Sequence, residues 1–186
     1  VRLTIADNVA PVAYLLGTLV TPGWHRGAGE LMVAAGDFGS GIRRIDVTVN
    51  GQGVPPQSSF DCALLPGSPV ASRTQPCAPG RVVSANLDTR LAPFVDGTNR
   101  VLTCVRDYGE GGQVGCASAT VDVDNAPPEV AFANARDPEE PELIRAPVAV
   151  RHSGFAAGGI AYRPLDGGAW RELPTTHAGG ELRAVV

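Results

Sequence analysis

The chain has 186 residues and a mass of 19.2 kDa, with 23 Gly and 16 Pro. Charged residues make up 18% and aromatic residues 5%, which favours short strands joined by turns over long solvated helices. A net charge of −4 and a pI near 5.3 argue against a nucleic-acid or anionic-membrane surface, because either requires clustered positive charge. Every basic residue is Arg, which we attribute to genomic composition.

Short strands are predicted along most of the chain. Residues 31–35 are an apolar run, and residues 45–51 alternate apolar and polar side chains before ending in Asn50-Gly51, a hairpin turn signal. Residues 81–87, 101–107 and 114–123 continue the pattern, and Gly, Pro and Asp clusters separate the strands. No segment longer than about ten residues has a helical period with caps. The sequence therefore predicts an all-β fold built as an antiparallel sandwich.

Four cysteines allow three pairings. A hairpin folded about Glu110 places Cys104 opposite Cys116, at the separation of neighbouring strands, where a disulfide is feasible. Cys62 and Cys77 are then left to pair across a Pro-rich loop. Free thiols and zinc are alternatives, but the close Cys pair that is typical of zinc sites is absent. Two disulfides would imply an oxidising, extracytoplasmic location.

An internal repeat divides the chain. Residues 5–12 recur as residues 123–130, and each copy contains Asp-Asn-x-x-Pro. A strand at 30–37 is echoed at 143–151, so the period exceeds 100 residues and suits tandem sandwiches. Each Asp-Asn-x-x-Pro junction is interpreted as a short, stiff linker, because Pro fixes φ and lacks a backbone donor.

Three parts follow from the repeat. Residues 1–8 are expected to be the last strand of a preceding domain, residues 9–124 a complete domain, and residues 125–186 the first part of another. The chain ends within a predicted strand at 181–186 and shows no signal peptide and no run of 18 apolar residues. We interpret it as a fragment of a longer protein.

Several segments carry a resemblance to a known family. They are the Asp37-x-x-Ser40-Gly41-Ile42 segment, Leu87-Asp88-Thr89, Phe94 to Asn99, Cys104-Val105-Arg106-Asp107, the Asp124-Asn125 exit and Trp170 to Pro174. Together they resemble the immunoglobulin-like repeats found in tandem in large exported bacterial proteins. The resemblance implies a β-sandwich in a surface or secreted protein and implies no ligand. The Asp-Asn-x-x-Pro exit is also similar to the calcium-binding cadherin linker, although the cadherin glutamate motifs are absent.

No catalytic set is evident in the sequence. His25, His152 and His177 lie in or beside turns and loops, and none adjoins a nucleophile motif. Trp24 and Trp170 could stack on a sugar ring, but we expect them to fill a core or an interdomain space. The chain is therefore predicted not to be an enzyme.

One acidic constellation could bind a metal. In a sandwich of this type the loops after residues 31–35 and 101–107 lie at the pole where the chain enters, so Asp7, Asn8, Asp37 and Asp107 would converge there. Calcium takes six to eight oxygen ligands, and these side chains could supply several of them. Aspartate more often accepts backbone N–H bonds in turns, so turn capping is the preferred interpretation and calcium the alternative. No other cofactor is expected.

The predicted function is a non-enzymatic structural or adhesion segment that acts as a spacer in an extracellular or cell-surface bacterial protein. The alternative is an accessory or carbohydrate-binding module of a secreted enzyme. The expected partners are neighbouring immunoglobulin-like domains of the same chain, together with a surface glycan or protein. Neither nucleic acid nor membrane insertion is expected.

Overall fold

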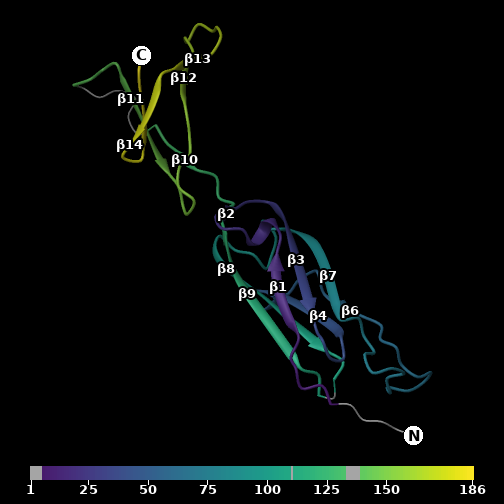
Figure 1. Cartoon of the computed structure of the whole chain (residues 1–186). Coiled ribbons are helices and arrows are strands. Elements are labelled where there is room, and N and C mark those ends of the chain that lie inside the picture. Colours follow the sequence, from purple (N-terminus) through teal and green to yellow (C-terminus); the bar gives the residue numbers. More distant parts are fainter. Residues whose placement is uncertain (1–5, 110, 133–138) are drawn as a thin grey trace. The chain divides into compact units, whose positions relative to one another are not determined.

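The computed structural model describes residues 6–109, 111–132 and 139–186. The chain separates into two compact units, Val1–Asn125 and Ala126–Val186 (Figure 1). Both are built from strands, and the described residues include one short 3-10 turn, η1 (Thr18–Val20). The all-β prediction is confirmed. In the described residues no helix is long and apolar enough to cross a membrane.

Unit 1 is a sandwich of two sheets. One sheet has the order β1 (Val12–Leu16), β3 (Ala28–Gly36) and β7 (Gly80–Asp88), all antiparallel. The other has the order β2 (Trp24–His25), β9 (Val114–Val123), β8 (Gly97–Asp107), β4 (Ile42–Val49) and β5 (Gln52–Gly53), and β6 (Ser58–Ser59) also pairs with β4. Within it β2 pairs with β9 in parallel and the remaining pairs are antiparallel. The orders 1-3-7 and 9-8-4 correspond to the A-B-E and G-F-C strands of an immunoglobulin sandwich.

The core of unit 1 lies between the two sheets. Alternate residues of β3, β4 and β8 point inward and are buried, as the two-residue period requires. The largest fully buried side chains are mostly branched aliphatics, namely Leu19, Leu31, Val33, Ile42, Ile45, Val47, Val49, Val101, Val105, Val121 and Val123. This aliphatic core holds the ends of the strands, and therefore the loops between them, in fixed positions.

The predicted hairpin register is correct. Strands β8 and β9 pair from Gly97 with Val123 to Arg106 with Val114, and Cys104 lies opposite Cys116. The two residues form a disulfide, and Cys62 and Cys77 form the other. Glu110, the predicted centre of the turn, lies outside the described residues.

Unit 2 contains two small antiparallel sheets. One has the order β10 (Glu129–Val130), β11 (Leu143–Ala149), β15 (Glu181–Val185) and β14 (Thr175–Ala178). The other pairs β12 (Ile160–Tyr162) with β13 (Arg171–Leu173). Its buried core is small and consists of Ala146, Ile160, Leu182 and Ala184.

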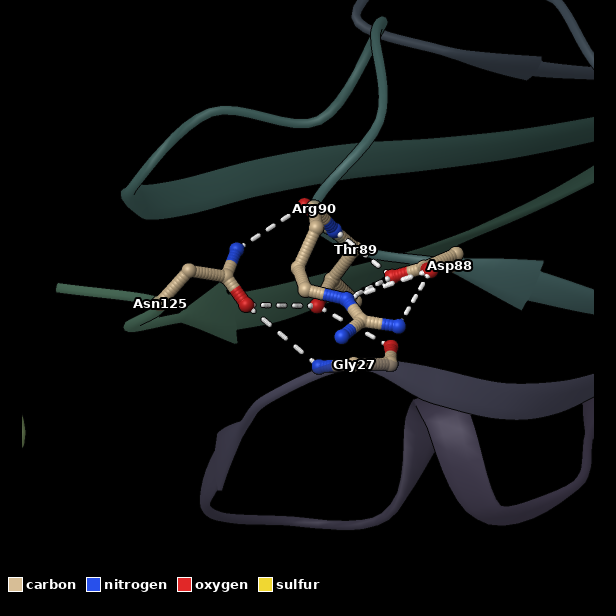
Figure 2. Close-up of polar contacts among 5 residues, drawn as sticks. All are labelled: Gly27, Asp88, Thr89, Arg90 and Asn125. Atoms are coloured by element: carbon tan, nitrogen blue, oxygen red, sulfur yellow. Dashed lines mark hydrogen bonds and ion pairs between the residues drawn. The ribbon is translucent and has the colours of Figure 1, made fainter.

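The chain leaves unit 1 through a polar latch centred on Asn125 (Figure 2). The Asn125 side-chain oxygen accepts hydrogen bonds from the Gly27 N–H (3.3 Å) and the Thr89 hydroxyl (3.2 Å). Its amide nitrogen donates to the Thr89 carbonyl (2.9 Å), and its backbone N–H donates to the Asp96 carboxylate (2.9 Å). Asn125 is therefore fixed to three separate segments of the sandwich that it leaves.

Candidate metal centre

The candidate site lies at the end of unit 1 where β3 and β8 end, whereas Asn125 follows the end of β9. Strand β3 ends at Gly36, so Asp37 is the first residue after it, and β8 ends at Asp107. Asp7 comes from the segment that precedes β1. One carboxylate oxygen of each lies within 4.8 Å of the other two, so three of the four predicted residues converge. Asn8, the fourth, is exposed.

Each aspartate caps a turn, as the preferred interpretation predicted. Asp37 Oδ2 accepts a hydrogen bond from the Gly41 N–H at 2.5 Å, and Asp107 Oδ1 accepts one from the Gly109 N–H at 3.0 Å. Asp7 uses both oxygens, for the N–H groups of Ser40 (2.6 Å) and Val9 (3.2 Å). These bonds give the carboxylates fixed orientations.

Turn capping leaves two buried oxygens unsatisfied. Asp37 is 3% exposed and Asp107 is 1% exposed. Asp37 Oδ1 and Asp107 Oδ2 have no hydrogen-bond partner among the described residues. The ion pairs found in the described chain join other acidic groups to Arg44, Arg90, Arg145 and Arg183. Buried carboxylate oxygens are normally paired with a hydrogen-bond donor or a cation, so these two oxygens are available to a further donor or to a metal ion.

The protonation equilibria of the cluster reflect this arrangement. Burial raises the pKa of Asp107 above its ordinary value of 3.8, the Gly109 N–H opposes the rise, and the charges of Asp7 and Asp37 add to it. Burial alone would also raise the pKa of Asp7, but hydrogen bonds from the Ser40 N–H, the Ser40 side chain and the Val9 N–H outweigh it and lower that pKa. A cation bound among the three groups would favour the ionised form of Asp107.

Two glycines make the close packing of this site feasible. A Cβ atom on Gly39 would collide with the Asp7 carboxylate, so only glycine admits Asp7 to this position. Gly41 has a φ of +85°, and a Cβ there would collide with the carbonyl of Cys77. The segment Asp37-Phe38-Gly39-Ser40-Gly41 is thus shaped to receive both the incoming chain and the disulfide loop.

The other candidate residues lie apart from this site. His25 is on β2, with Nε2 2.9 Å from the Thr21 carbonyl oxygen, and the His177 ring lies 4.6 Å from the Phe155 ring, centroid to centroid. His152 is exposed. The expectation that Trp24 and Trp170 fill a core is wrong within each unit, because they are 44% and 65% exposed.

The two disulfides bear on the environment of the protein. Cys62 joins Cys77 and Cys104 joins Cys116, and all four cysteines are paired. Disulfides persist in oxidising environments and are rare in reducing ones. The cysteine content therefore suggests an oxidising environment.

No family model matches the chain, and no curated protein matches it. Among solved structures, the chain is similar to the CARDB domain of a Pyrococcus furiosus protein that was solved in complex with di-metal ions. The identity is 14%, the match covers 62% of this chain and 94% of that domain, and the TM-score is 0.38.

Proposed function

We propose that the chain is a non-catalytic segment of tandem immunoglobulin-like sandwiches that acts as a spacer in an exported protein, and that a calcium ion binds where the chain enters unit 1. The observation that carries the calcium proposal is the pair of buried oxygens, Asp37 Oδ1 and Asp107 Oδ2, which lack a hydrogen-bond partner among the described residues. Residues 1–5 lie outside the described chain, and Asp7 is hydrogen-bonded to Ser40 of unit 1.

The donor set suits a hard cation. All three side chains offer carboxylate oxygens, which calcium prefers, and no sulfur or imidazole ligand is involved. One divalent ion would offset two of the three negative charges, whose oxygens lie within 4.8 Å of one another. Asn8, an exposed residue next to Asp7 in the chain, offers a further amide oxygen.

Calcium bound at this site would restrain the segment that leads into β1. Asp7 lies before β1, whereas Asp37 and Asp107 belong to the body of the sandwich, so an ion shared among them ties the incoming chain to the domain. At the other end, the Asn125 latch fixes the outgoing chain, and Pro127-Pro128 follows directly. Chain entry and exit that are both fixed suit a spacer, because short proline-containing connections leave neighbouring domains little freedom.

Calorimetric melting of the 186-residue chain tests the calcium proposal. Millimolar calcium should raise the melting temperature of unit 1, since a ligand that binds only the folded state stabilises it. Asp37→Ala should abolish that shift. Asp46→Ala is the matched control, because Asp46 lies on the neighbouring strand and pairs with Arg44 at the surface. Absence of a calcium-dependent shift in the unmodified chain would leave turn capping as the whole role of the cluster.

A glycan-binding role is the second candidate, supported by Trp170. Its side chain is 65% exposed, and the Arg163 guanidinium lies 5.2 Å from its ring centroid. An exposed indole offers an apolar face for a sugar ring. Binding on a glycan array that is lost in Trp170→Ala and kept in Trp24→Ala would support this role, and it would also suit an accessory module of a secreted enzyme.

A further inference from the structure

The loop closed by the Cys62–Cys77 disulfide is hydrogen-bonded to the acidic site. Residues 77–79 run beside the site segment 37–42. The Asp37 N–H donates to the Pro79 carbonyl (2.7 Å), the Ile42 N–H donates to the Ala78 carbonyl (2.9 Å), and the Cys77 N–H donates to the Ser40 carbonyl (3.1 Å). One end of the disulfide therefore belongs to the strip of backbone that holds Asp37 and Ser40 in place.

A second connection runs through Tyr108, the residue after Asp107. Its backbone N–H donates to the Ser40 hydroxyl oxygen at 3.1 Å, and its phenol hydroxyl donates to the Pro69 carbonyl near the tip of the loop. The Arg43 guanidinium lies over the Tyr108 ring, 5.5 Å from its centroid. The loop thus contacts the segments that carry both buried carboxylates.

The loop itself depends on its covalent closure. Most of residues 63–76 are exposed or half-buried, and Pro76 is the buried exception. Its internal backbone bonds run from Ala63 N–H to the Pro76 carbonyl, Leu65 N–H to the Val70 carbonyl, Ser68 N–H to the Leu65 carbonyl and Ser72 N–H to the Ala63 carbonyl. A segment with so little buried surface gains order chiefly from the crosslink that closes it.

We infer that the Cys62–Cys77 disulfide is a positioning brace for the cation site, so that the closed loop raises the calcium affinity of Asp37 and Asp107. The inference rests on the proposed calcium site. Opening the disulfide removes the restraint on residues 77–79 and, through them, on segment 37–42. Part of the free energy of calcium binding is then used to order both segments. Because the coupling is reciprocal, bound calcium also favours the closed disulfide by the same factor.

Reduction of the unmodified chain tests the reciprocal effect. Dithiothreitol transfers two electrons and two protons to a disulfide, which becomes two thiols, while the reagent forms its own cyclic disulfide. Mass spectrometry of alkylated peptides follows each disulfide separately at increasing reductant. In saturating calcium the equilibrium constant for opening Cys62–Cys77 should fall about five- to tenfold. Cys104–Cys116 should respond less, because the β8–β9 ladder already fixes its strands.

Two double variants test the forward effect by calcium titration. Cys62→Ser/Cys77→Ser should bind calcium about five- to tenfold more weakly than the unmodified chain. Cys104→Ser/Cys116→Ser is the matched control and should stay within about twofold. Circular dichroism confirms that each variant is folded, and Tyr108→Phe, which keeps the disulfide and removes only the bond to Pro69, should give a smaller loss.

The outcomes separate the two proposals. Equal calcium affinity in the unmodified chain and Cys62→Ser/Cys77→Ser would overturn the brace and leave the calcium site standing. No calcium binding in the unmodified chain would overturn both. We expect weaker calcium binding in Cys62→Ser/Cys77→Ser and not in the control variant. We also expect calcium to protect the Cys62–Cys77 disulfide from reduction.

Discussion

Replacement of Asp37 by Asn should change the stability of the protein in opposite directions with and without calcium. Asn keeps an oxygen for the Gly41 N–H, so the turn cap is preserved. Its amide nitrogen takes the place of Asp37 Oδ1, which has no hydrogen-bond partner in the described structure, and can donate to a neighbouring carboxylate. The substitution therefore removes a charge and leaves the local backbone geometry in place.

The distances between the carboxylate oxygens determine how much Asp37→Asn should stabilise calcium-free unit 1. The three carboxylates lie within 4.8 Å of one another. At that distance each ionised pair repels by about 1 kcal/mol at the dielectric of water and about 3.5 kcal/mol at the effective dielectric near a protein surface. Asp37 takes part in two such pairs. After side-chain relaxation, we expect Asp37→Asn to stabilise calcium-free unit 1 by about 1–3 kcal/mol at pH 7.

Urea denaturation in chelator and in millimolar calcium measures both effects. In chelator the variant should unfold at higher urea than the unmodified chain, and calcium should shift its midpoint little. A variant that is less stable than the unmodified chain in chelator would refute the reasoning, because the three carboxylates would then not repel one another. A calcium shift that survives in the variant would show that Asp37 is not a ligand.

Three further predictions concern single residues. Asn125→Ala should destabilise unit 1 by about 1–3 kcal/mol in urea denaturation, because the half-buried Gly27 N–H and the carbonyl of buried Thr89 lose their partner. A change above about 0.5 kcal/mol in Asn8→Ala would contradict the exposed position of Asn8. Asn99 is fully buried, and its side chain bonds the backbone of Val95 and Gly97, so Asn99→Ala should cost about 3 kcal/mol. A cost below about 1 kcal/mol would be inconsistent with that network. The raised pKa of Asp107 means that a proton on this carboxyl favours the folded state, so its contribution to calcium-free stability should decline as pH rises from about 4 through that pKa. Protons and calcium compete for the same carboxylate, so the calcium-induced rise in melting temperature should shrink as pH falls from about 7 to about 4. A rise that stays constant over this pH range would contradict the prediction.

Local sequence patterns predicted the parts of the fold that depend on neighbouring strands. The two-residue period and the Gly-rich turn fixed the β8–β9 register, which in turn placed Cys104 opposite Cys116. Asn50-Gly51 forms the predicted turn, with φ values of +51° and +82°. These features depend on residues close in the chain, so alternation and turn chemistry determine them.

Features set by contacts between distant segments could not be read from the sequence. The pole where Asp7, Asp37 and Asp107 meet was expected from sandwich topology, but the direction of each carboxylate depends on which N–H it caps. In the sequence, Gly41 is the one sign that residues 77–79 lie beside the Asp37 segment. Its positive φ and its contact with the Cys77 carbonyl require glycine. Trp24 and Trp170 do not fill the core of either unit, because an apolar side chain alone does not indicate which face of a strand is covered.

Isothermal titration of calcium into the 186-residue chain tests whether Asp7, Asp37 and Asp107 bind the ion. We expect one binding event per chain. It should be lost in Asp107→Asn, which keeps an oxygen for the Gly109 N–H. No binding heat at millimolar calcium, or binding that is unchanged in Asp107→Asn, would contradict it.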